Sequence, residues 1–113
     1  MKQANSETNR NTKATAKRLE LYRVYQTMLG LCDQPMRGSD RALIELRVGE
    51  LEREVQALPV SRERMILVLH YFEGNSIERC AELMDVSRST AFRIHRRALE
   101  MLNFNERLRA MHA

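Results

Sequence analysis

Apolar residues recur at three- and four-residue intervals through most of this chain, most clearly between residues 75 and 102. In that stretch the apolar and small positions are Ala81, Val86, Ala91, Ile94, Ala98 and Leu102. Such spacing keeps one face of each helix turned toward a shared core. Ser76 and Ser87 each precede a periodic segment, where a serine hydroxyl accepts an unpaired amide proton of the first helical turn. The pattern predicts a helix over 77–83, a turn over 84–86, and a second helix from Ser87 to about Leu102.

Three further helices are predicted upstream, each bounded by glycine, proline or a capping residue. The helix over 16–31 has an apolar stripe at Leu21, Tyr25, Met28 and Cys32, widened by Leu19, Tyr22 and Leu29. The next runs from Ser39 or Asp40 to Leu58, with a stripe at Ile44, Val48, Leu51 and Val55. After Pro59 a third helix begins at Ser61 and ends at Gly74, with apolar positions at Met65, Ile66, Leu69 and Phe72.

The first fifteen residues have a different character from the rest. They are rich in Asn, Thr, Lys and Ser and lack periodic apolar positions, which predicts a disordered basic tail over 1–15. The whole pattern predicts an all-α fold. A helical hairpin over 16–58 precedes a three-to-four-helix helix-turn-helix domain over 59–104, and residues 105–113 form a C-terminal tail.

The stripe Ile44, Val48, Leu51 and Val55 resembles a short heptad seam, and two interpretations of it remain open. In the first, the seam packs against the helix over 16–31 and closes an antiparallel hairpin within the chain. In the second, it is a dimer or partner seam, which makes a homodimer one expected partner, and the two interpretations can both be true.

Charge is distributed unevenly along the chain. The net charge is +4, and residues 1–18 and 86–113 each carry +4, whereas residues 39–58 and 59–85 each carry −2. Positive charge is therefore concentrated in the first residues and in the predicted helix over 88–102. This distribution is typical of a nucleic-acid-binding protein, with double-stranded DNA as the expected partner.

The face of that helix opposite its apolar stripe carries the candidate functional residues. A helix-turn-helix presents the N-terminus of its second helix to base edges in the major groove. We therefore assign base reading to Arg88, Ser89, Phe92 and Arg93. For Phe92, contact with a thymine methyl and packing within the protein are both open. Phosphate contacts are assigned to Ser76, Ser87, His95, Arg96 and Arg97, which lie at helix N-termini or further along the helix.

Residues 58–102 resemble the fourth conserved region of bacterial sigma factors, a helix-turn-helix without a wing. The shared positions are Asp85, Val86, Ser87, Arg88, Ile94, Ala98, Leu99 and Leu102. The pattern is also similar to the DNA-binding domain of two-component and quorum-sensing regulators. Nothing in the chain resembles the second sigma region, so we do not expect a complete sigma factor. The resemblance implies a small transcription regulator of phage or mobile-element type, which can also contact RNA polymerase.

Other functional classes find little support. The three histidines are far apart in sequence, and Cys32 and Cys80 lack the spacing of metal ligands. We therefore expect no enzyme activity, no metal and no cofactor. No apolar run is long enough for a membrane span, and no signal peptide is present, so we expect no membrane association and a cytoplasmic location.

Three functions follow from these observations. The first is a sequence-specific DNA-binding transcription regulator. The second is an RNA polymerase-binding accessory protein, such as a co-sigma subunit or an antiterminator, in which protein contacts dominate. The third is a phage packaging subunit, since such subunits also carry helix-turn-helix domains.

Overall fold

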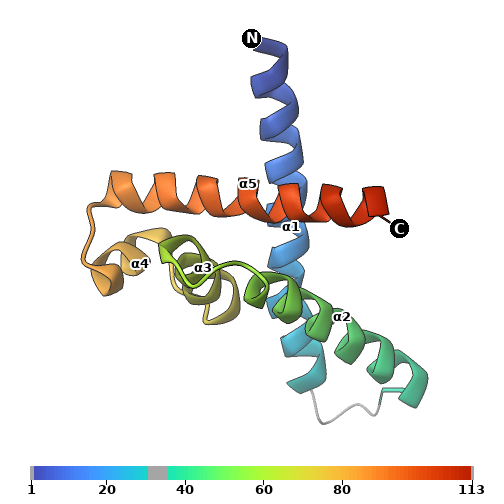
Figure 1. The fold of residues 1–113 in the computed structure, drawn as a ribbon. Coiled ribbons are helices and arrows are strands. Elements are labelled where there is room, and N and C mark those ends of the chain that lie inside the picture. The colour runs from blue at the N-terminus through green and yellow to red at the C-terminus, as the bar shows by residue number, and fades with distance from the viewer. Residues whose placement is uncertain (1, 31–35, 113) are drawn as a thin grey trace.

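A computed structural model describes residues 2–30 and 36–112, with side chains from residue 10 onward. The elements in chain order are α1 (Lys2–Gly30), α2 (Gly38–Gln56), α3 (Arg62–Leu67), the π-helix η1 (Val68–Phe72), α4 (Ile77–Met84) and α5 (Arg88–His112) (Figure 1). Every regular element in these two ranges is a helix, which confirms the all-α prediction.

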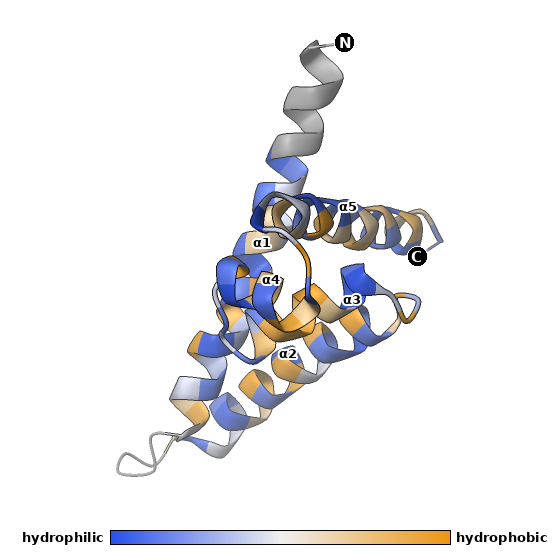
Figure 2. Ribbon diagram, turned by 90° about the vertical axis from the view of Figure 1, so that its left-hand side faces the viewer, coloured by the Kyte–Doolittle hydropathy of each residue, from blue (hydrophilic) through white to orange (hydrophobic). Residues whose placement is uncertain are grey.

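A single hydrophobic core joins the N-terminal helices to the C-terminal ones. All five α-helices contribute fully buried side chains to it. The largest of these are Leu19, Val55, Ile66, Leu67, Cys80 and Leu102. Figure 1 shows α1 crossing α5, while α2 returns from the far end of α1 toward α3. Figure 2 shows apolar residues of α2 and α3 facing the interior. The predicted hairpin is therefore part of the same core as the helix-turn-helix.

The seam on α2 is covered within the chain. Its residues Ile44, Val48, Leu51 and Val55 are 8%, 8%, 3% and 0% exposed. Polar contacts along the same helix pair, from Tyr22 to Glu52 (3.0 Å) and from Arg18 to Glu54, hold α1 against α2. The hairpin interpretation is therefore confirmed. The seam offers no free surface in this fold, which corrects its assignment as a dimer or partner seam.

The first helix begins much earlier than its sequence pattern indicates. Residues 2–15 belong to α1, so the prediction of a disordered tail is wrong for them, and residue 1 lies outside the described residues. Thr15 is only 2% exposed, and its hydroxyl donates a 3.0 Å hydrogen bond to the carbonyl oxygen of Asn11. Tertiary burial against α5 supports a segment whose residues have modest helix propensity.

The buried face of this helix follows one edge of the predicted apolar stripe. Leu19 and Tyr22, which widen the stripe, are buried, whereas Leu21 and Met28 are exposed. Cys32 lies outside the described residues. Thr12 and Thr15 extend the buried face into the segment predicted as a disordered tail.

The last helix also extends beyond its predicted end. α5 continues to His112, so the prediction of a tail over 105–113 is wrong for residues 105–112, and residue 113 lies outside the described residues. Ion pairs from Arg109 to Glu54 (3.1 Å) and from Glu106 to Arg18 connect the final turns to α2 and α1. These long-range pairs support a segment whose apolar residues Phe104, Leu108 and Met111 are exposed.

The predicted helix over 61–74 is divided into α3 and the π-helix η1. Ser61 caps α3 by accepting a hydrogen bond from the amide of Arg64 at 3.3 Å. In η1 the hydrogen bonds span five residues, as in the bond from the Glu73 amide to the Val68 carbonyl oxygen (3.0 Å). Gly74 follows with φ of +80°, a conformation that glycine adopts without steric cost.

Candidate nucleic-acid interface

The two serines predicted as caps begin both helices of the helix-turn-helix. The Ser76 hydroxyl accepts a hydrogen bond from the Arg79 amide (3.0 Å), and Ser87 accepts one from the Thr90 amide (3.2 Å). Ser87 also donates to the Thr90 hydroxyl at 2.8 Å. Each cap satisfies an amide that has no partner within its helix. The start of α5, which carries the predicted base-reading residues, is thereby fixed.

The turn between α4 and α5 depends on a left-handed residue. Asp85 has φ 56° and ψ 48°, and the Val86 amide donates to the Ala81 carbonyl oxygen at 3.0 Å. This six-to-one bond belongs to the Schellman motif that ends many helices. Ala91 and Ala98 are fully buried on the core-facing side of α5. The opposite face of α5 points outward.

All four predicted base-reading residues lie on the exposed side of α5: Arg88, Ser89, Phe92 and Arg93. The guanidinium of Arg88 lies 5.7 Å from the centre of the Phe92 ring and 3.2 Å from the Glu78 carboxylate. Phe92 is 43% exposed, so its ring supports Arg88 while keeping an outward edge. The structure thus brings the four residues together within the first two turns of α5.

His95 does not lie with the surface arginines. Its Nε2 and the Tyr71 hydroxyl oxygen are joined by a 2.7 Å hydrogen bond, and its ring lies 5.4 Å from that of His70. Burial, with a smaller contribution from the His70 charge, lowers the pKa of His95 to about 4. The ring is therefore neutral at pH 7 and cannot supply a positive charge to a phosphate. We correct its assignment: His95 connects η1 to α5.

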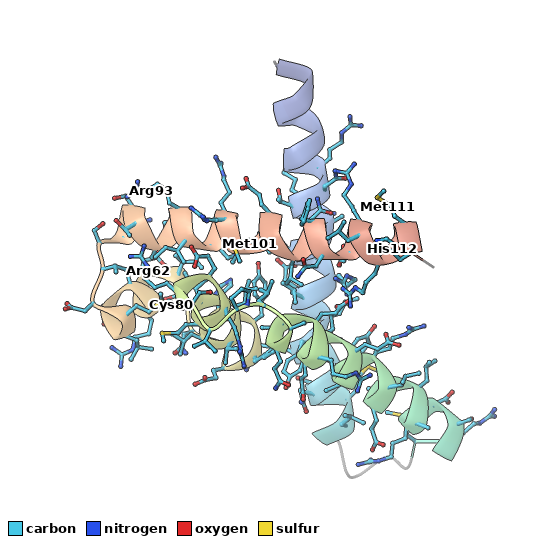
Figure 3. All side chains as sticks on the ribbon, in the orientation of Figure 1. Arg62, Cys80, Arg93, Met101, Met111 and His112 are labelled. Atoms are coloured by element: carbon cyan, nitrogen blue, oxygen red, sulfur yellow. The ribbon has the colours of Figure 1, made fainter. Side chains whose placement is uncertain are left out.

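Arg96 and Arg97 are exposed, and both line a cleft of about 420 Å³ on the α3 side of α5. Arg62 of α3 lines the same cleft, and Figure 3 shows Arg62 and Arg93 at the same end of the molecule. Glu63 pairs with Arg97 at 3.5 Å and partly neutralises this side. Sequence reasoning missed Arg62, because its position just inside a helix start gave no indication of its proximity to α5.

A second cleft lies on the other side of α5, where α1 crosses it. Its volume is about 570 Å³, and its lining residues are Thr12, Lys13, Phe92, Arg93, His95, Arg96 and Leu99. The charged side chains in this lining are Lys13, Arg93 and Arg96, all cationic at pH 7. Arg93 and Arg96 line both clefts and therefore lie between them. The first half of α5 is thus flanked by cationic residues contributed by α1 and α3.

Within residues 2–30 and 36–112, no group of three or more His, Cys, Asp or Glu residues is arranged to hold a metal ion. Of the helices described, none combines the length and the apolar character needed to cross a membrane.

Comparison with known proteins agrees with the geometry of the C-terminal helices. Residues 60–103 match the family model of sigma-70, region 4. No curated protein and no solved structure matches the chain. The family match covers α3, η1, α4 and most of α5, and it leaves α1 and α2 outside.

Proposed function

We propose that this chain, whose residues 60–103 form a sigma-70 region 4-like helix-turn-helix domain, is a sequence-specific DNA-binding transcription regulator of phage or mobile-element type. It would act in the cytoplasm of a bacterial or phage-infected cell. The observation that carries the proposal is the exposed, cationic first half of α5. Its arginines flank a helix N-terminus that is capped by Ser87 and fixed by the turn at Asp85.

In this proposal the first two turns of α5 enter the major groove. Arg88 and Arg93 are assigned to bases because they lie in these two turns. Each can donate two hydrogen bonds to O6 and N7 of a guanine. One such pair contributes about 1–3 kcal/mol of discrimination between bases. Ser89 is short enough to allow close approach of the backbone, and the outward edge of Phe92 suits a thymine methyl group.

Contacts with phosphates would set the register of the helix without reading sequence. Arg96 and Arg97 are exposed further along α5, and Arg62 adds a cation from α3. The N-terminal amides behind Ser76 and Ser87 attract anions in the same way. These groups suit the two strands that border the major groove.

The test is selection of bound duplexes from a random DNA pool, using the purified chain without polymerase. We expect enrichment of one sequence, and its loss in the R88A/R93A variant. A matched control is R41A/R47A, which removes two exposed, ion-paired arginines of α2 and should retain the enrichment. Absence of enrichment by the wild-type chain, or undiminished enrichment by R88A/R93A, would contradict the proposal.

The form of the enriched site decides between two modes of action. An asymmetric site supports a single domain bound beside polymerase. A palindrome with half-sites about 34 Å apart supports a homodimer. Since the α2 seam is covered within the chain, such a dimer would have to use another surface.

A second candidate function is an RNA polymerase-binding accessory protein, and one apolar surface favours it. A cleft of about 520 Å³ is lined by Leu58, Pro59, Arg97, Glu100, Met101, Phe104 and Asn105. Phe104 is 61% exposed, and Leu108 and Met111 extend its stripe along α5. A polymerase complex held by this surface should persist as salt rises, whereas phosphate-dominated DNA binding should weaken steeply. Pull-down of polymerase by wild type and F104A at increasing salt distinguishes the two functions.

A further inference from the structure

The first half of α1 carries a stripe of positive charge outside the region 4-like domain. Arg10, Lys13 and Lys17 are all exposed and are separated by three and four residues. In a helix this spacing places them on one face, over about 10 Å of its length. No acidic residue occurs between positions 8 and 19, and the nearest ones on the helix, Glu7 and Glu20, each lie three residues outside the stripe. Thr12, Thr15 and Leu19 bury the opposite face.

This stripe lies beside the recognition helix. Lys13 lines the same cleft as Phe92, Arg93 and Arg96 of α5. Figure 1 shows that α1 crosses α5 and continues beyond it, on the side away from α3 and α4. That is the side toward which the exposed face of α5 is turned. A duplex that receives the first turns of α5 would therefore lie next to α1.

The geometry points to α1 as a second DNA-contacting element: we propose that Arg10, Lys13 and Lys17 bind phosphates of the duplex that α5 enters. The proposal rests on the DNA binding proposed above and adds a partner surface from outside the family match. Lys13 shares its cleft with arginines alone among charged residues, which suits a phosphate strand passing between α1 and α5. The contact would carry no sequence information, since phosphates are common to all sequences.

The position of α1 also restricts how α5 can dock. The major groove of B-DNA is about 12 Å wide and admits one α-helix. Lys13 of α1 shares a cleft with Phe92 and Arg96 of α5, and Arg18 of α1 pairs with Glu106 further along α5. Because α1 crosses the second half of α5, the first turns of α5 are the part free to enter the groove. Lys13 and Arg96 would then face the strand at the groove edge.

The experiment measures dissociation constants at several salt concentrations, on a duplex with the selected site and on a scrambled duplex of equal length. The arm variant is R10Q/K13Q/K17Q. Its matched control is R37Q/R41Q/R53Q, which removes the same charge from exposed positions at and along α2. We expect the arm variant to weaken binding to both duplexes by a similar factor. The slope of log K against log salt should become shallower by about 0.9 for each lost phosphate contact, or about 2–3 in total.

Each outcome has a separate meaning. Equal weakening by the arm and control variants would overturn the proposal, because only net charge would matter. Tighter binding by the arm variant would also overturn it, since α1 would then obstruct the duplex. If wild type binds both duplexes equally, the base-reading role of α5 fails while the arm can still be scored on its salt slope. If wild type binds neither duplex at low salt, both proposals fail.

Discussion

A 2.7 Å hydrogen bond joins the hydroxyl of Tyr71 to Nε2 of His95 and thereby ties the π-helix η1 to the recognition helix α5. Burial lowers the pKa of His95 to about 4 and raises the pKa of Tyr71. Both side chains are therefore neutral at pH 7, and protonating the buried His95 ring carries a cost in the folded state.

Stability should consequently fall in acid. In the unfolded chain His95 titrates near pH 6.5, so between about pH 6.5 and 4 the unfolded state binds a proton that the folded state does not. The contribution is complete above pH 6.5 and is lost progressively toward pH 4, amounting to at most roughly 3 kcal/mol. Urea unfolding of wild type and His95→Gln across this range measures it as the difference between the two pH profiles.

The same variant tests the corrected role of His95. At pH 7.5 His95→Gln should keep the DNA affinity of wild type, since a neutral, hydrogen-bonded ring makes no phosphate contact. A large loss of affinity in a variant that is still fully folded would restore the original assignment of His95 to phosphate.

Glu54 should be a stabilising residue that joins three helices. Its carboxylate pairs with Arg18 of α1 and with Arg109 of α5, and its side chain is 14% exposed. We expect Glu54→Gln to cost about 1–2 kcal/mol, more than a fully exposed pair contributes. Glu45→Gln is the control, since Glu45 pairs with Arg41 on the open surface of α2. Chemical denaturation measures both, and equal small effects would contradict the prediction.

Asp85 holds a backbone conformation that most residues avoid. Its φ of 56° lies in the left-handed region, which costs an ordinary L-residue roughly 1–2 kcal/mol. Asp85→Gly should therefore stabilise the fold by about 0.5–1 kcal/mol, and Asp85→Val should destabilise it by about 1–2 kcal/mol. Thermal unfolding of the two variants gives the order, and a Val variant as stable as the Gly variant would disprove the argument.

Ser87 combines a structural role with a proposed phosphate contact, and two substitutions separate them. Ser87→Ala should cost about 1 kcal/mol through loss of the cap to Thr90. Ser87→Asp should restore that stability, because aspartate also caps helices and suits the helix N-terminus. Its negative charge should nevertheless weaken DNA binding, which a fluorescence titration would detect. Unchanged affinity in Ser87→Asp would place this helix start away from phosphate.

Glu78 should restrain a base-reading arginine in the free protein. Its carboxylate lies 3.2 Å from Arg88, and both side chains are exposed. Glu78→Gln should raise affinity for the selected site by up to about fivefold, since exposed pairs are worth about 0.2–1 kcal/mol. Glu82→Gln is a suitable control, because Glu82 pairs with Arg79 rather than with Arg88. A gain of the same size in the control would indicate a general charge effect.

Local patterns were sufficient for the helix-turn-helix itself. The caps at Ser76 and Ser87 depend on neighbouring amides, and the turn at Asp85 depends on carbonyl groups within α4. Because these interactions join residues only a few positions apart, the residue types at those positions are sufficient to predict them. The periodic burial of Ala91, Ile94, Ala98 and Leu102 follows from helical geometry in the same way. The sequence by itself therefore determined the helical fold and the residues that share the exposed face of α5.

Only the tertiary structure decided where the helices end and what lies beside α5. The helix extends over 2–15 and 105–112. Burial of Thr12 and Thr15 supports the first segment, and ion pairs from Glu106 to Arg18 and from Arg109 to Glu54 support the second. The burial of His95 requires Tyr71, 24 residues earlier, and the exclusion of the α2 seam from solvent requires α1. Each of these outcomes depends on groups brought together by packing, which local propensity and periodicity do not encode.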